Sequence, residues 1–71
     1  MDEIEITTAT IQLDQFLKWA GAVDSGGQAK QLIADGKVTV NGIVAKERRK
    51  KLQPGDIVAA DGLGQWKVSG A

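Results

Sequence analysis

The sequence predicts an α+β fold, in which two helices pack on a small, mostly antiparallel sheet of three to four strands. Apolar residues repeat with the spacing of a helix in the first half of the chain and alternate as in a strand after Gly36. The turn-forming pairs Asn41-Gly42 and Pro54-Gly55 then separate short strands. A chain of 71 residues allows one domain with a thin core, so we expect residues 1–71 to form a single domain.

The N-terminal residues 1–10 begin with the alternation Ile4–Ile6, which predicts a short edge strand or an ordered arm. The period then changes, and four apolar residues fall on one face of a helix. They are Leu13, Phe16, Leu17 and Ala20. Gly21 can adopt a positive φ and is a natural stop, so the first helix is expected over Leu13–Ala20.

The second helix has a sharper start signal. Ser25 and Gln28 have the spacing of a capping box, in which Ser25 accepts a hydrogen bond from the N–H of Gln28 and the Gln28 side chain reaches back to the N–H of Ser25. A short apolar stripe follows, formed by Ala29, Leu32 and Ile33. Gly36 ends it, so the helix is expected over Gly26–Asp35, and residues 21–24 join the two helices into a compact pair.

Period-two alternation begins after the second helix. Residues 37–40 place two valines on one face of a strand and Lys37 and Thr39 on the other. Asn41-Gly42 predicts a type I′ hairpin turn, because both residues tolerate a positive φ. Ile43–Ala45 is then the returning strand.

The last third of the chain contains two further strands. Pro54 and Gly55 suit the central positions of a type II turn. Ile57–Ala60 is expected to form a strand after this turn, and residues 61–71 contain a last strand at Gln65–Val68.

The residues that most often carry catalysis are missing. The chain has no histidine and no cysteine, and its acidic residues show no spacing typical of a metal or acid/base site. We therefore expect no enzymatic activity, no metal and no cofactor. No stretch approaches the ~20 apolar residues that cross a membrane, and the acidic N-terminus does not resemble a signal peptide. A cytoplasmic monomer without membrane contact is expected.

Charge is distributed unevenly, although the formal net charge is zero. Residues 1–24 carry a net charge of −4, and residues 25–71 carry +4. Salt screens charges over roughly 8–10 Å, so a partner senses the local face. The basic run, residues 46–51 (Lys-Glu-Arg-Arg-Lys-Lys), has five cations in six positions. By itself it is equally consistent with a solvated loop and with a phosphate-binding patch.

Three other features could contribute to binding, and each also has a purely structural interpretation. Free N–H groups at the start of the second helix could hold a phosphate, although a plain cap at Ser25 explains them alone. Asn41 is by default only a turn residue. Trp19 and Trp66 could stack on bases, but burial is the commoner role of an aromatic in so thin a core.

The segment AKQLIADGKVTVNG, residues 29–42, followed by Pro54-Gly55-Asp56, resembles the small RNA-binding domain named after ribosomal small-subunit protein S-four. Residues 13–18 are similar to the first helix of that family. The resemblance covers about residues 11–60, which leaves residues 1–10 and 61–71 outside the motif. The chain looks most like the stand-alone bacterial members, the YbcJ-like proteins.

The resemblance implies the alpha-L RNA-binding motif, which grips structured RNA, such as ribosomal or transfer RNA, without catalysis. Carried onto this sequence, the expected RNA-binding residues are Ser25, Gln28, Lys30, Gln31, Lys37, Asn41, Lys46, Arg48, Arg49, Lys50 and Lys51. Gly26 and Gly27 stand where many members place an arginine after the capping serine, which shifts phosphate contact onto Lys30 and the basic run. Two alternatives to RNA binding remain. One is an adaptor that docks onto a ribosomal or RNA-processing protein, and the other is a DNA-binding module.

Overall fold

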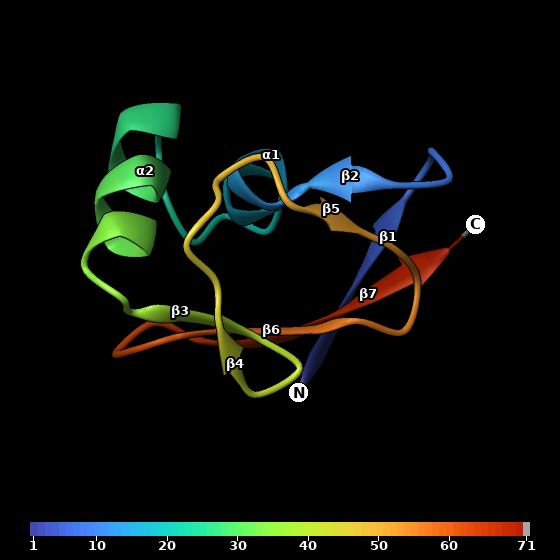
Figure 1. The fold of residues 1–71 in the computed structure, drawn as a ribbon. Helices are drawn as coiled ribbons and strands as arrows, with labels where there is room; N and C mark the ends of the chain where they lie inside the picture. Colours follow the sequence, from blue (N-terminus) through green and yellow to red (C-terminus); the bar gives the residue numbers. More distant parts are fainter. Residues whose placement is uncertain (71) are drawn as a thin grey trace.

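The computed structural model describes residues 1–70, so residue 71, at the end of the expected C-terminal segment, lies outside the described residues. The elements are β1 (Asp2–Ile6), β2 (Ile11–Gln12), α1 (Leu13–Trp19), α2 (Gly26–Ala34), β3 (Val38–Val40), β4 (Ile43–Val44), β5 (Lys51–Leu52), β6 (Ile57–Ala60) and β7 (Gly64–Gly70). Figure 1 shows the helices and the β2–β5 pair on one side of the larger sheet. The predicted α+β class, with a helical pair on a sheet, is confirmed.

The larger sheet has five strands in the order β1-β7-β6-β3-β4, and β2 and β5 form a separate two-stranded sheet. The expectation of three to four strands is therefore wrong. The additional strand is β1, which pairs in parallel with β7 at the edge of the sheet. Parallel neighbours need a long connection between them, and here almost the whole chain provides it. The other pairings are antiparallel, so the sheet is mostly antiparallel, as predicted.

The strands present alternate residues to the helices. Val40 lies opposite Val58, and Val58 lies opposite Trp66, so these three side chains share the covered face. α1 adds three buried residues to the core and α2 adds two, which are Leu13, Phe16, Leu17, Ala29 and Ile33. Leu52 on β5 is fully buried and ties the smaller sheet to this core. Among residues 1–70, no helix covers the opposite face of the larger sheet (Figure 1).

The helices end at Trp19 and Ala34, each one residue before the predicted position, and Gly21 (φ +78°) and Gly36 (φ +73°) follow with positive φ angles. The capping box is confirmed in one half, since Ser25 Oγ accepts a hydrogen bond from the Gln28 N–H at 3.3 Å. The other half is wrong. Gln28 Oε1 accepts from the N–H of Asp24 at 2.6 Å, because the chain entering α2 presents this N–H to the amide oxygen.

The two predicted turns contact each other. Asn41 and Gly42 have φ angles of +53° and +84°, as a type I′ turn requires. Asn41 Nδ2 donates to Asp56 Oδ1 at 3.1 Å, and Asn41 Oδ1 accepts from the N–H of Ile57 at 2.9 Å. Asp56 Oδ2 in turn accepts from the N–H of Gln53 at 3.0 Å. The hairpin turn is therefore fastened to the turn that precedes β6.

Candidate nucleic-acid interface

The basic run, residues 46–51, leads from β4 toward α1 and joins the core at both ends. Just before it, the N–H of Ala45 donates to the carbonyl oxygen of Val38 at 3.0 Å. At its other end, Lys51 lies opposite Gln12 in the β2–β5 pair. The run is thus fixed to β3 at one end and to β2 at the other.

Two carbonyl groups of the run also cap α1. This helix has no side-chain cap, and the first N–H groups of a helix lack intrahelical partners. The N–H of Leu13 donates to the carbonyl of Lys50 at 2.8 Å, and the N–H of Asp14 donates to that of Arg48 at 2.9 Å. The N–H of Lys50 donates to the carbonyl of Glu47 at 3.2 Å. Backbone contacts therefore hold the run in one conformation beside α1.

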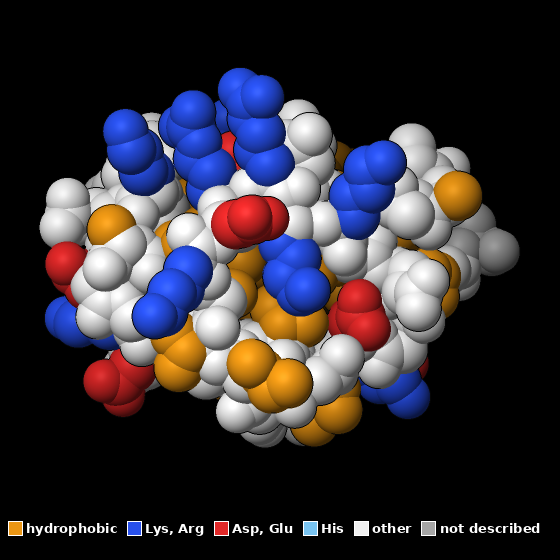
Figure 2. All heavy atoms as spheres, viewed as in Figure 1, with side chains coloured by type: hydrophobic (Ala, Val, Ile, Leu, Met, Phe, Trp, Pro, Cys, Tyr) orange, Lys and Arg blue, Asp and Glu red, His pale blue; other side chains and the backbone are white. Residues whose placement is uncertain are grey.

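The side chains of the run face solvent. All six are exposed, whereas Ala45 before them and Leu52 after them are buried. Figure 2 shows Lys and Arg side chains gathered over the upper part of one face, near the helices, with single acidic side chains among them. Cations on a fixed backbone lose less freedom when they bind an anion than cations on a mobile loop would. The arrangement suits a phosphate-rich ligand.

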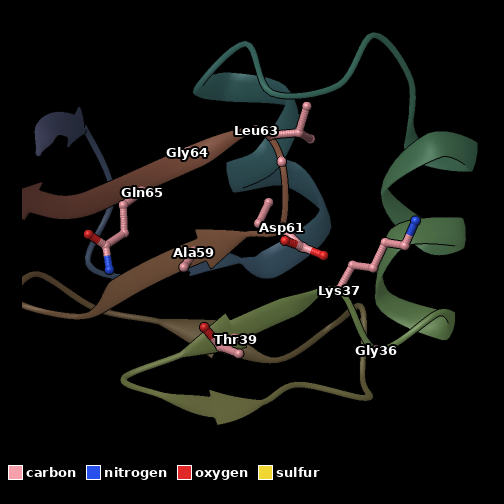
Figure 3. Close-up of a pocket in the computed structure, with 10 residues that line it drawn as sticks. Gly36, Lys37, Thr39, Ala59, Asp61, Leu63, Gly64 and Gln65 are labelled. Atoms are coloured by element: carbon pink, nitrogen blue, oxygen red, sulfur yellow. The ribbon is translucent and has the colours of Figure 1, made fainter.

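Lys37 lies at the border between the run and a different hollow. It precedes Val38, whose carbonyl holds the start of the run. Figure 3 shows this residue next to Asp61 at one end of a hollow of about 650 Å³, which Thr39 and Gln65 also line. The carbonyl of Lys37 accepts from the N–H of Asp61 at 2.8 Å. This bond joins the two backbones, while the Lys37 side chain extends away from the Asp61 carboxylate toward α2 (Figure 3).

The candidate residues of α2 fall on two sides of the helix. Gln28 and Gln31, three positions apart, line a hollow with Leu63 of the β6–β7 connection. Lys30 is one or two positions from each of them, and residues at those spacings do not face each other. The structure therefore does not bring the two glutamines and Lys30 onto a common face.

The four uncharged candidates all have hydrogen-bond partners within the fold. Ser25, Gln28 and Asn41 make the contacts described above, and Gln31 Nε2 donates to Asp35 Oδ1 at 3.0 Å. The seven charged candidates are exposed, and they are Lys30, Lys37, Lys46, Arg48, Arg49, Lys50 and Lys51. The chemistry that this surface can offer a partner is therefore mainly that of cations.

The two glycines at the start of α2 leave space where a side chain would be. A Cβ on Gly26 would meet no atom within 4 Å, and one on Gly27 would meet only Ser25 Oγ at 3.7 Å. Both residues lie in the helix, and neither has a positive φ. Nothing in the local packing requires glycine at these two positions.

Trp19 is the feature that sequence reasoning placed wrongly. The sequence favours burial for both tryptophans. Trp66 is 7% exposed, as expected, but Trp19 is 61% exposed. The sequence holds a signal for the difference. Trp66 alternates with Val68 on a covered strand face, whereas Trp19 falls one position before Ala20, the last residue of the apolar stripe.

Two kinds of site do not occur in the described part of the chain. Residues 1–70 contain no group of three or more His, Cys, Asp or Glu side chains that could hold a metal ion. Within the same residues, neither helix has the length and apolar character needed to cross a membrane.

Comparison with known proteins identifies relatives over nearly the whole chain. The family model of the S4 domain matches residues 4–68. "Probable ribosome maturation protein RlbA" of Bacillus subtilis is 42% identical over 65 residues, which cover 92% of each chain. "Putative RNA-binding protein YbcJ" of Escherichia coli is 40% identical over 52 residues, which cover 73% of this chain and 74% of that one.

A solved structure shows the same fold at lower sequence similarity. The 30S ribosomal protein S4e of Thermoplasma acidophilum superposes with a TM-score of 0.59 and 20% identity. The match covers 79% of this chain, which spans 30% of that ribosomal protein. At this identity the likeness concerns the fold alone.

Proposed function

This chain belongs to the S4 domain family, and on that premise we propose that it binds folded RNA through the basic run, without catalysis. The family and the two relatives, one named for ribosome maturation and one for RNA binding, support an RNA-binding role. The observation that carries the finer proposal is the fixed backbone of the run. Its carbonyls cap α1 while its five cations face solvent.

The geometry favours contacts to the RNA backbone over contacts to base edges. The major groove of an A-form helix is too deep and narrow for side chains, so a small rigid face senses phosphates and overall shape. Each neutralised phosphate releases counterions, which makes the binding free energy depend on salt. We assign the phosphate contacts chiefly to Lys46, Arg48, Arg49, Lys50 and Lys51, with a further contact from the exposed Lys30 on α2.

The proposed RNA is ribosomal RNA. A relative that shares 42% identity over 92% of this chain carries a name that refers to ribosome maturation, which favours ribosomal RNA over transfer RNA. A chain that acts on ribosomes would act in the cytoplasm. The proposal includes binding as a monomer, because a single chain presents the whole basic run.

The test replaces Arg48, Arg49, Lys50 and Lys51 together with alanine. The capping contacts use backbone carbonyls, so the variant should keep its fold. Each lost phosphate contact should flatten the slope of log K against log[salt] by about 0.7 to 0.9. The affinity for several ribosomal RNA fragments is measured by fluorescence anisotropy at several salt concentrations. The variant should bind each fragment more weakly than the parent does.

The matched control is Lys67→Ala. Lys67 is exposed and lies opposite Glu3 and Ile57, on the sheet face away from the helices. It should leave both affinity and slope unchanged. A quadruple variant that binds RNA like the parent would refute the proposed face. Recovery of a protein partner that survives nuclease treatment, together with an absence of RNA binding, would favour the adaptor hypothesis instead.

A further inference from the structure

Trp19 is a large aromatic side chain held in the open at the C-terminal end of α1. It is 61% exposed, and its Nε1–H donates to the carbonyl oxygen of Glu5 on β1 at 2.9 Å. This bond satisfies the polar group of the indole and restricts the ring. What remains available to a partner is therefore the flat π-surface of the ring.

The ring borders two adjoining hollows. One, of about 390 Å³, is lined by Ile11, Gln15, Lys18 and Trp19. The other, of about 260 Å³, shares Ile11, Gln15 and Trp19 and adds residues from 6 to 10, including three threonines. Both volumes lie near the lower end of the range found for small-molecule sites. A planar group could lie against the indole from either hollow.

The surroundings of the ring are mainly apolar, with one amide and one cation beside it. Gln15, Lys18 and Trp19 lie at i, i+3 and i+4, so they share one exposed face of α1. The half-buried side chain of Ile11 provides an apolar floor. These groups match the parts of a nucleotide. The aromatic ring and the apolar floor suit a flat base, the amide suits its polar edge, and the cation suits a phosphate.

The location connects this face with the basic run. The N-terminal end of α1 is capped by carbonyls of the run, and Trp19 is the last residue of the same helix. At 1.5 Å of rise per residue, Trp19 lies only about 7 to 8 Å along the axis from Asp14. The basic run and Trp19 therefore lie at the two ends of the same seven-residue helix.

We propose that Trp19, with Lys18 beside it, is a stacking site for an unpaired base of the bound RNA. This inference rests on the proposed RNA-binding function and adds a preference to it. The preferred RNA has a paired segment on the basic run and an unpaired nucleotide next to it. We assign the occupant as a base rather than a protein surface, because Gln15 and Lys18 stand beside the ring and the other end of the same helix is capped by the basic run.

The experiment compares a blunt RNA duplex with the same duplex carrying a short single-stranded overhang. Base–aromatic stacking corresponds to a change in affinity of roughly 5- to 140-fold. Trp19→Ala should weaken binding of the overhang RNA by about that factor and leave binding of the blunt duplex unchanged. Trp19→Phe keeps an aromatic face and should retain most of the preference.

Tryptophan fluorescence gives an independent reading. Trp66 is buried, so the change in emission on adding overhang RNA should come from Trp19 and should disappear in Trp19→Phe. The circular dichroism spectrum of each variant should match that of the parent. The melting temperature should fall only by the small effect of losing the hydrogen bond from Trp19 Nε1–H to the carbonyl of Glu5.

The outcomes separate this inference from the proposed function. If both RNAs bind through the basic run and Trp19→Ala affects neither, the stacking site is refuted and the proposed function stands. If neither RNA binds, both proposals fall. A parent protein that sediments as a dimer while Trp19→Ala is monomeric would assign the ring to self-association and overturn the stacking site.

Discussion

The two helices of this protein begin in physically different ways. α2 is capped by its own neighbourhood, through Ser25 Oγ and the N–H of Gln28 three residues later. α1 has no side-chain cap and uses the carbonyls of Arg48 and Lys50, more than thirty residues further along the chain. One helix start is thus a local property of the sequence, and the other exists only once the fold has formed.

Because of this difference, the stability of the fold and the proposed RNA binding are linked at the start of α1 but not at the start of α2. The backbone of the basic run stabilises α1 and at the same time fixes the cations proposed to hold RNA. A change that loosens the run should therefore reduce both stability and RNA affinity. A change at the start of α2 should affect stability with little effect on the geometry of the run.

The largest expected effect comes from Leu52→Ala, which removes the fully buried anchor at the end of the run. Replacing a buried leucine with alanine costs about 3 kcal/mol, a large part of the ~4–10 kcal/mol expected for a domain of this size. Amide exchange at Leu13 and Asp14 should accelerate, because their acceptors lie in the run. RNA affinity of the folded protein should fall although no cation is removed.

The control for this change is Leu32→Ala on α2. Leu32 is only partly buried, so its replacement should cost less and should leave the Leu13 and Asp14 amides protected. Equal exchange rates at these two amides in both variants would show that the anchor at Leu52 does not hold the cap of α1.

A smaller effect is expected from Ser25→Ala, which removes the local cap of α2. Loss of such a cap costs about 1 kcal/mol, measured by denaturant unfolding. Faster amide exchange should be confined to the first turn of α2. Ser25→Asp, which supplies another capping oxygen, should restore the stability. If Ser25→Ala instead exposes the amides at the start of α1, the two helix starts are not independent.

The smallest change in stability is expected from Gly26→Arg, which adds a cation at the start of α2. A Cβ at this position meets no atom within 4 Å, so the side chain is accommodated. The gain in helix propensity over glycine, up to about 1 kcal/mol, is partly offset because a cation near a helix N-terminus opposes the dipole. RNA affinity should rise and the salt slope should steepen by about 0.7 to 0.9.

Gly26→Ala is the matched control, since it adds helix propensity without charge. It should raise stability and leave the salt slope unchanged. A Gly26→Arg variant whose slope equals that of Gly26→Ala would show that the start of α2 lies away from the bound RNA.

Much of the fold could be predicted because its signals are local. The α2 helix, the Asn41-Gly42 turn and the strand Ile57–Ala60 lie where the sequence places them. Each depends on a cap, a turn pair or an alternation within a few residues. The parallel pairing of β1 with β7 could not be predicted in this way, because it joins the two ends of the described chain and no short pattern encodes it.

The candidate site divides in the same way. The cations of the run are exposed as the charge pattern predicts, because ammonium and guanidinium groups are costly to bury. The placement of Gln28 and Gln31 beside Leu63, apart from Lys30, depends on how α2 is rotated against the sheet. The exposure of Trp19 depends on where β1 runs relative to α1, since the bond to Glu5 fixes the ring.

The sequence alone determined the class of fold, the ends of the helices and the resemblance to an RNA-binding family, because periodicity, caps and motifs are properties of neighbouring residues. Only the tertiary structure decided that the basic run is a fixed surface. The run is held by its hydrogen bonds to α1, by the bond of the preceding Ala45 to β3 and by the burial of Leu52 after it, and these contacts depend on the folded chain.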